Sequence, residues 1–293
     1  MNSRQVLQKA IIELKKSNNP TPELDSKILL GLVLGKNEKV NFHENLNISE
    51  EDRKNYEKII KIRARGKPVS RILGKRNFWN YDFSIISYTL DPRSESELLV
   101  EVVLNYFKDK NIPLQILDLG SGSGCLGLSI TKELSFSTLV NVDVCKKALN
   151  QVRINAKQLE ISDRNHYIHA DWFNKNWIEK INNGTSKVEN SNNKFDLILC
   201  NPPYIKSKSI SKLQNEVKKY DPILALDGGE DGCDSYRAIF SNIKHLLSKD
   251  GVIVLEIGYD ILKIVKKIVN NSGFKVLKIY KDLLGIDRVL LIK

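Results

Sequence analysis

From residue 114 onward, the chain alternates between short apolar runs and segments whose apolar residues recur at helical spacing. The apolar runs predict buried strands, and the helical spacing predicts amphipathic helices. Strands are expected at 114–119, 138–143, 165–170, 195–200 and 251–257, and helices at 124–134, 145–159, 234–248 and 259–271. This rhythm is typical of a mainly parallel sheet that is covered by helices on both faces.

Two further apolar runs, 274–280 and 286–292, are joined by only a few residues around Gly285. Parallel neighbours need a long crossover, so these runs predict an antiparallel hairpin at the sheet. The predicted fold is therefore α/β, with a doubly wound, mainly parallel, seven-stranded sheet. The polar stretch 182–193 is rich in Asn and Ser and predicts a mobile loop.

Residues 1 to about 75 predict a small helical domain. A first helix has its apolar residues on one face, a second begins at Thr21-Pro22 and ends at Gly35, and a third begins at Ser49 and ends near Gly66. Such a domain either grips a partner or packs as an appendage without a recognition role.

Residues 78–85 are aromatic and partly alternating, which predicts a short hairpin that links two domains. An amphipathic helix through Phe107 follows. We therefore divide the chain into a helical domain at 1–75, a hairpin linker at 76–92 and an α/β domain at 93–293.

The net charge, the cysteines and the length of the apolar runs bear on which partners and which compartment suit this protein. The net charge is +11, but the excess basic residues are spread along the chain, which favours compositional bias over a nucleic-acid site. The four cysteines are scattered without a C-x-x-C pair, which argues against zinc and disulfides and fits a reducing cytosol. No signal-type or membrane-length apolar run is present. We expect a cytoplasmic monomer without a metal or a membrane partner.

The segment Asn201-Pro202-Pro203-Tyr204 directly follows the predicted strand 195–200. Two prolines stop the strand and stiffen the chain after it. A carboxamide and an aromatic ring are therefore held at the carboxyl end of a strand, where open α/β sheets bind ligands. The alternative interpretation is an Asx-Pro turn with a packing tyrosine.

A glycine-rich segment, Gly120-Ser121-Gly122-Ser123-Gly124, follows one strand and opens a helix. Its backbone is suited to a close approach by a cofactor, and with Gly127 the spacing alone does not exclude NAD. Asp118 would repel a pyrophosphate but suits an ammonium group. Asp143, at the end of the next strand, either accepts two ribose hydroxyls or caps the following helix.

A third strand ends just before Asp171-Trp172. The carboxylate of Asp171 is placed to accept from an adenine amino group, and the ring of Trp172 is suited to cover the face of the base. The alternative for Trp172 is packing beneath the helix that follows.

Taken together, these motifs resemble the HemK/PrmC family of class I S-adenosylmethionine-dependent protein-(glutamine-N5) methyltransferases, which act on peptide chain release factors. The resemblance covers nearly the whole chain. Its motifs are Gly74 with Phe78-Trp79 and Phe83, Pro92-Arg93-Ser94-Glu95-Ser96-Glu97, Asp118 to Gly124, Asp143, Asp171-Trp172, Asn201 to Tyr204, and Leu255-Glu256-Ile257-Gly258. Ser96 stands where the family usually has Thr, which keeps the hydroxyl.

The resemblance implies methyl transfer from S-adenosyl-L-methionine to the glutamine side chain of the Gly-Gly-Gln motif. The catalytic residues would be Asn201, Pro202 and Tyr204: the Asn201 oxygen and the Pro202 carbonyl accept the two amide N–H groups, and Tyr204 lines the flat amide. The substrate would contact Arg93, Glu97 and Asn201 to Tyr204. The cofactor would contact Asp118, Gly120, Ser121, Gly122, Ser123, Gly124, Asp143, Asp171, Trp172 and Asn201.

Three rival functions stay open at this point. An adenine-N6 nucleic-acid methyltransferase shares the Asn-Pro-Pro-Tyr logic and suits the positive charge, whereas the helical domain and Pro92-Arg93 favour a protein substrate. A sister enzyme methylates a glutamine of a ribosomal protein, and the segment 94–97 argues against it. A catalytically silent binding module would have lost Asn201 or Asp143, and both are present.

Overall fold

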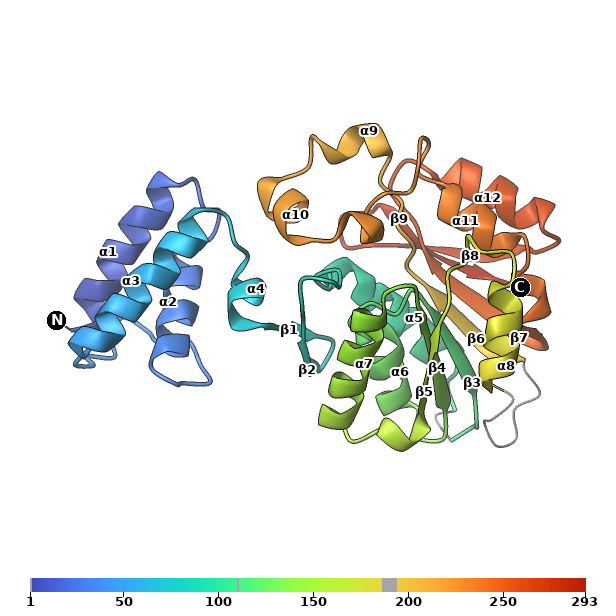
Figure 1. Cartoon of the computed structure of the whole chain (residues 1–293), viewed down its shortest axis with the longest axis horizontal. Helices are drawn as coiled ribbons and strands as arrows, with labels where there is room; N and C mark the ends of the chain where they lie inside the picture. Colours follow the sequence, from blue (N-terminus) through green and yellow to red (C-terminus); the bar gives the residue numbers. More distant parts are fainter. Residues whose placement is uncertain (1, 110, 186–193) are drawn as a thin grey trace. The chain divides into compact units, whose positions relative to one another are not determined.

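The structure is a computed structural model that describes residues 2–109, 111–185 and 194–293. The chain forms two compact units: Met1–Gly74 with Gln214–Tyr220, and Lys75–Leu213 with Asp221–Lys293 (Figure 1). This division differs from the predicted one in two respects. The hairpin groups with the larger unit, and residues 214–220 group with the N-terminal helices.

The first unit contains the three predicted helices, α1 (Ser3–Lys16), α2 (Pro22–Val33) and α3 (Glu50–Ala64), with two short helices, α4 (Val69–Leu73) and α10 (Asn215–Tyr220). Ser49 caps α3 by accepting from the N–H of Asp52 at 3.0 Å. Thr21 makes no such cap at α2, because its hydroxyl instead donates to Asp25 at 2.8 Å. The short helices escaped prediction because five or six residues show no period.

The second unit is built on a seven-stranded sheet in the order β5-β4-β3-β6-β7-β9-β8. β3 (Gln115–Leu119), β4 (Thr138–Asp143), β5 (Asn165–His169), β6 (Phe195–Cys200) and β7 (Leu247–Glu256) are parallel. β9 (Asp287–Ile292) runs antiparallel to both β7 and β8 (Val276–Lys281). The doubly wound sheet and the terminal antiparallel hairpin are therefore confirmed.

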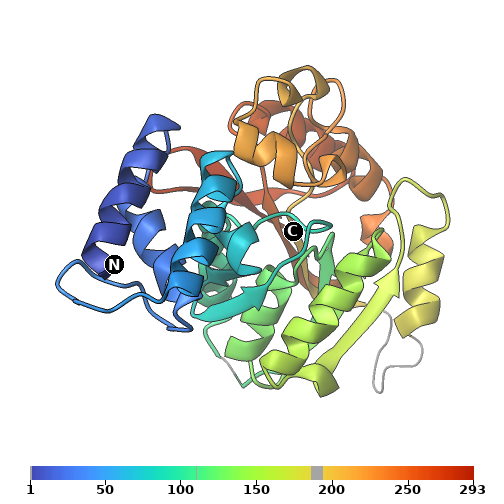
Figure 2. The same cartoon turned by 60° about the vertical axis from the view of Figure 1, so that its left-hand side comes forward.

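Helices cover both faces of this sheet (Figures 1 and 2). One hydrophobic core packs the sheet against α5 (Glu97–Tyr106), α6 (Cys125–Glu133) and α7 (Lys146–Gln158). The other packs it against α8 (Trp177–Thr185), α11 (Asp234–Phe240) and α12 (Leu262–Asn271). Alternate residues of each central strand enter alternate cores, as the pleat requires. A separate hairpin of β1 (Lys75–Phe78) and β2 (Tyr81–Ser84) precedes α5.

Several predicted boundaries were wrong, and the largest differences lie in the C-terminal half of the chain. The helix expected at 234–248 ends at Phe240, a 3-10 turn spans Ile243–His245, and β7 already begins at Leu247 because Leu247 pairs with Phe195. The polar residues after Leu247 hid this strand from the pattern. The helix expected at 259–271 begins at Leu262. Residues 182–185 of the expected loop belong to α8, and 186–193 lie outside the described residues.

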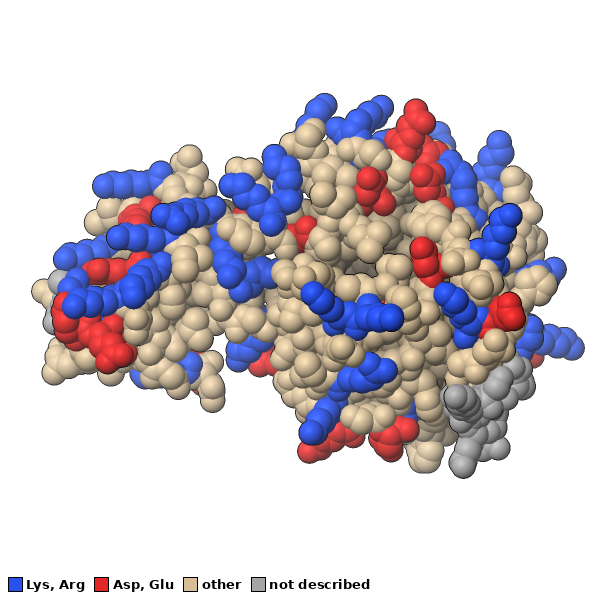
Figure 3. Space-filling view, viewed as in Figure 1, with Lys and Arg blue, Asp and Glu red and all other residues tan. Residues whose placement is uncertain are grey.

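Lys and Arg side chains are dispersed over the face shown in Figure 3, with Asp and Glu side chains among them. This distribution agrees with a compositional origin of the positive charge on that face. Among the residues that the structure describes, no helix has both the length and the apolar character that crossing a membrane requires.

Candidate active site

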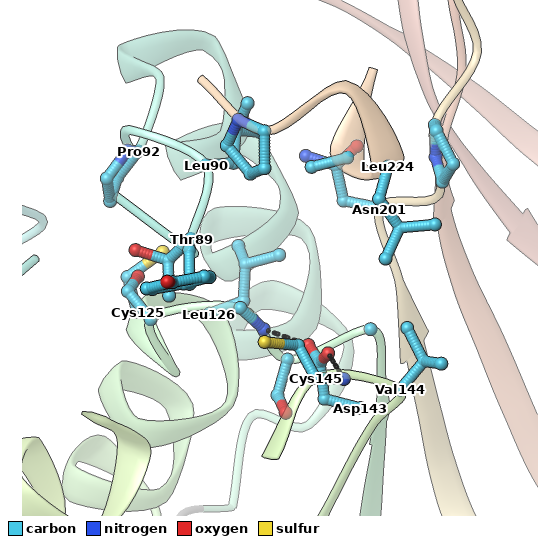
Figure 4. A pocket seen from close by; sticks show the side chains of 18 of the residues that line it. Thr89, Leu90, Pro92, Cys125, Leu126, Asp143, Val144, Cys145, Asn201 and Leu224 are labelled. Atoms are coloured by element: carbon cyan, nitrogen blue, oxygen red, sulfur yellow. Dashed lines mark hydrogen bonds between the residues drawn. The ribbon is translucent and has the colours of Figure 1, made fainter. Parts of the chain in front are cut away.

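A cavity of about 400 Å³ opens in the second unit at the carboxyl ends of β3, β4, β5 and β6. Its walls are the glycine segment 120–123, the ends of β4 and β6, and loops around residues 88–96, 171–173 and 222–227. Figure 4 shows Asn201 and Leu224 on one side of the cavity and Asp143 with Cys145 on the other. The volume lies in the range of small-molecule and cofactor sites.

The glycine segment is shaped by backbone conformations that disfavour side chains. Gly120, Gly122 and Gly124 have φ of 77°, 56° and 81°. A Cβ on Gly120 would lie 3.1 Å from the ring of Trp172, so the loop is also packed closely from behind. The segment thus offers bare backbone to the cavity, which fits a cofactor that is held by main-chain contact.

Asp143 ends β4 and is tied into this loop. One carboxylate oxygen accepts from the N–H of Gly122 at 2.9 Å, and the other accepts from the N–H of Cys145 at 2.7 Å. Burial raises the pKa of Asp143, and the two N–H groups oppose that shift. A carboxylate has about four lone-pair sites, more than these two bonds use, so Asp143 keeps acceptor capacity for a ligand hydroxyl.

Asp118 and Gly124, which the sequence also predicted to contact the cofactor, are not among the described residues that line the cavity. The Asp118 carboxylate is buried and accepts from the N–H of Gly127 in α6 at 3.2 Å. Burial raises the pKa of Asp118 to about 7. Asp118 therefore holds the first turn of α6, which directly follows the glycine segment.

Asp171 and Trp172 follow β5 and both line the cavity, and their predicted contacts with the cofactor stay predictions. One Asp171 oxygen accepts from the N–H of Phe173 at 2.9 Å, which fixes the carboxylate in a turn. The Trp172 ring backs Gly120.

Asn201 stands at the end of β6 on the cavity wall beside Pro203. Its Nδ2 donates to Ser96 Oγ at 3.2 Å. Pro202 is buried behind this wall. The Tyr204 hydroxyl donates to Glu256 at 3.2 Å, and burial raises the pKa of that hydroxyl. Pro202 and Tyr204 thus lie behind the described cavity lining, and their predicted contacts with substrate stay predictions.

Arg93 and Glu97 have partners within the second unit. The Arg93 guanidinium pairs with the buried Asp221, which begins the segment that carries Leu224 at the cavity mouth. Glu97 accepts from the backbone N–H of Trp79 at 2.9 Å and so fixes the β1–β2 hairpin. Arg93 also lines the cavity, whereas Glu97 is not among the described lining residues.

Sequence reasoning gave no role to Ser96 or Glu256. Ser96 Oγ donates to Glu256 at 2.6 Å, and Glu256 is 1% exposed. A carboxylate that directly follows the apolar run 252–255 was a visible signal, because such a group needs partners when it is buried. The lining segment 222–225 carried no signal, because a run of four apolar residues in a loop shows no period and exposed apolar residues are common.

Two family models match the chain. One, described as the PrmC N-terminal domain, matches residues 5–74, and one, described as the methyltransferase small domain, matches residues 90–228. Together they confirm the resemblance that the motifs predicted.

A release factor glutamine methyltransferase from Clostridium acetobutylicum is 36% identical over 293 residues, which cover 99% of this chain and 98% of that protein. A bifunctional methyltransferase from Rickettsia conorii is 32% identical over 98% of this chain, which spans only 57% of that longer protein. The solved protein-(glutamine-N5) methyltransferase (release factor-specific) from Alicyclobacillus acidocaldarius aligns with 69% of this chain and 92% of its own, at 22% identity and a TM-score of 0.41, too distant a likeness to bear on function. By its extended similarity to the Clostridium protein, the chain belongs to the family of release factor glutamine methyltransferases.

Proposed function

We propose that this protein transfers a methyl group from S-adenosyl-L-methionine to the side-chain amide nitrogen (N5) of the glutamine in the Gly-Gly-Gln motif of peptide chain release factors. The observation that carries the proposal is the cavity itself. A carboxamide, Asn201, occupies one wall, and a loop of bare backbone with Asp143 occupies another. The names of the full-length relatives support the same assignment.

The cavity fits the cofactor on three counts. The positive-φ glycine segment presents backbone to the cavity, the Asp143 carboxylate at the end of β4 can accept from a ligand hydroxyl, and Asp171 and Trp172 line the same cavity. Asp143 would hold the ribose, and Asp171 would accept from the adenine amino group. When it is bound, the cofactor supplies an electrophilic methyl: the new C–N bond takes the amide lone pair, the C–S electron pair stays on sulfur, and one N–H proton passes to water.

The protein's own contribution is orientation. An amide nitrogen is a poor nucleophile because its lone pair is delocalised into the carbonyl group. Asn201 Oδ1 and the Pro202 carbonyl would accept its two N–H bonds and direct the lone pair toward the methyl. The two prolines stiffen this segment, so the acceptors need little reorganisation when the substrate enters.

We further propose that the N-terminal helical unit contributes to recognition of the release factor, and that the protein acts in the cytoplasm as a monomer. Four free cysteines in the described residues suit a reducing compartment.

A parallel methylation assay tests the proposal. Tritiated S-adenosylmethionine is offered with a release factor, with ribosomal protein and with DNA, and label is expected on the release factor glutamine. A short Gly-Gly-Gln peptide measures how much recognition lies beyond the acceptor. Asn201→Ala should abolish transfer while cofactor affinity stays within a few-fold. Label on DNA adenine alone, or normal turnover by Asn201→Ala, would overturn the assignment.

A further inference from the structure

The pairing of β6 with β7 places two polar residues next to each other, Asn201 on the cavity wall and Glu256 buried behind it. Leu199 pairs with Val254 and Cys200 pairs with Leu255, so Asn201 and Glu256 are neighbours across the two strands. Leu199 and Val254 both belong to the core on the α5 face, and alternation brings the side chains two residues later to that same face. Ser96, directly before α5, meets both of them there.

Three side chains form one directed chain of hydrogen bonds. Asn201 Nδ2 donates to Ser96 Oγ at 3.2 Å, and Ser96 Oγ donates to Glu256 Oε2 at 2.6 Å. Tyr204 donates to the other oxygen, Oε1, at 3.2 Å. The main-chain carbonyl of Glu256 accepts separately from the buried hydroxyl of Tyr236 at 3.0 Å.

The direction of this chain follows from proton counting. A hydroxyl has one proton, and an ionised carboxylate only accepts. Burial raises the pKa of Glu256, while the hydrogen bonds from Ser96 and Tyr204 and the nearby Arg288 charge favour its ionised form. When Glu256 is ionised, the Ser96 proton is committed to it, and Ser96 can only accept from Asn201. A flipped Asn201 amide would need that same proton and would deprive a buried carboxylate of its shortest hydrogen bond.

We propose that Ser96 and Glu256 are positioning residues that set the orientation of the Asn201 carboxamide, with Nδ2 held by the protein and Oδ1 turned toward the cavity as an acceptor. Position 96 then needs a hydroxyl and not a particular side chain, which explains why Ser serves there. This inference rests on the proposed function, because it assigns the oriented oxygen to the N–H of the acceptor amide.

Three substitutions separate positioning from stability. Ser96→Ala removes the link, and Glu256→Gln replaces an obligate acceptor by an amide that also donates, so the Ser96 proton is no longer committed. Ser96→Thr keeps the hydroxyl and is the matched conservative variant. Tyr236→Phe removes a different buried hydrogen bond to Glu256, the one to its main chain, and controls for lost stability.

Steady-state kinetics on the release factor give the first readout. Ser96→Ala and Glu256→Gln should lower kcat roughly 100-fold, the scale of a small misplacement at a reacting centre. KM for the release factor and the calorimetric affinity for S-adenosylhomocysteine should stay within about threefold, because neither ligand's binding depends mainly on this chain. Ser96→Thr and Tyr236→Phe should keep kcat within about threefold of the wild type.

The second readout needs no turnover. The side-chain amide protons of Asn201, assigned by their loss in Asn201→Ala, should exchange with solvent faster in Ser96→Ala and Glu256→Gln than in the wild type or Ser96→Thr. Wild-type kcat in folded Ser96→Ala, unchanged exchange, or an equal loss of kcat in Tyr236→Phe would overturn the inference. If Glu256→Gln does not fold, the comparison of Ser96→Ala with Ser96→Thr tests the inference. A wild type that leaves the release factor unmethylated refutes the proposed function, while the exchange experiment still tests the orientation of Asn201.

Discussion

Asp143 offers the sharpest test of how the cavity holds its cofactor. Asp143→Ala removes both acceptor sites that we assign to the ribose hydroxyls. A hydrogen bond to a charged group contributes about 1.5–3 kcal/mol, and the open mouth lets water replace part of that loss. We therefore expect a net loss of about 2–4 kcal/mol, which corresponds to about 30- to 1000-fold in Kd.

Asp143→Asn keeps the shape of the side chain but removes its charge and replaces one oxygen by an NH2 group. Both carboxylate oxygens accept backbone N–H groups, at 2.9 Å from Gly122 and 2.7 Å from Cys145. An amide has one oxygen, so its NH2 group would face one of those donors. We expect a loss of affinity at the lower end of the same range, together with a disturbed glycine segment.

The assay is titration calorimetry with S-adenosylhomocysteine, which binds without turnover. Unfolding curves of the ligand-free variants check that they are folded. Cys145→Ser is the matched control, because it changes a side chain on the same wall and leaves its backbone N–H in place. An Asp143→Ala variant that binds within threefold of the wild type would refute the assignment of Asp143 to the ribose.

Two further predictions concern Asp118 and Arg93, whose side chains have hydrogen-bond partners within the protein. Burial raises the pKa of Asp118 from 3.8 to about 7. Folding is therefore accompanied by uptake of a proton between these two pH values, and the stability of the wild type falls as pH rises through that range. In urea titrations, the free energy of unfolding of Asp118→Asn relative to the wild type should therefore rise between pH 5 and pH 8 by about 3 kcal/mol. A constant difference would contradict the buried charge. Arg93→Gln should lower stability by about 1–3 kcal/mol because it leaves the buried Asp221 carboxylate with fewer donors. In a double-mutant cycle with Asp221→Asn the two effects should be strongly non-additive, whereas additive effects would favour a direct role of Arg93 at the substrate.

The elements of the sheet were predictable because each central strand is a short apolar run with a polar or glycine boundary. β7 shows where that approach fails. Its first residues are polar, and they are strand only because Leu247 pairs with Phe195 across a register shift. Pairing of that kind is a tertiary contact, and no local pattern of residues contains it.

The residues of the candidate site also divide into those that the sequence predicted and those that depend on tertiary contacts. Asn201 and Asp143 were predictable because each follows directly from the end of a strand, and position along the chain alone puts such residues at the sheet edge. Asp118 was assigned to the cofactor from its motif, although Leu117 and Leu119 both enter the α8 core and alternation therefore directs Asp118 toward α6. The link from Ser96 to Glu256 spans 160 positions and depends on strand register.

From the order of strands we expect that binding of the cofactor and orientation of the acceptor amide can be altered separately. β3 lies between β4 and β6, so the chain extends from it in opposite directions, and a crevice opens above such a reversal. Asp143 and Asp171 come from β4 and β5 on one side, whereas Asn201 and Glu256 come from β6 and β7 on the other. A substitution on the first side should therefore act on cofactor affinity, and one on the second side should act on kcat. If a single substitution on either side lowered cofactor affinity and kcat equally, the two sides would not act independently. The glycine segment after β3 would then transmit the disturbance from one side of the sheet to the other.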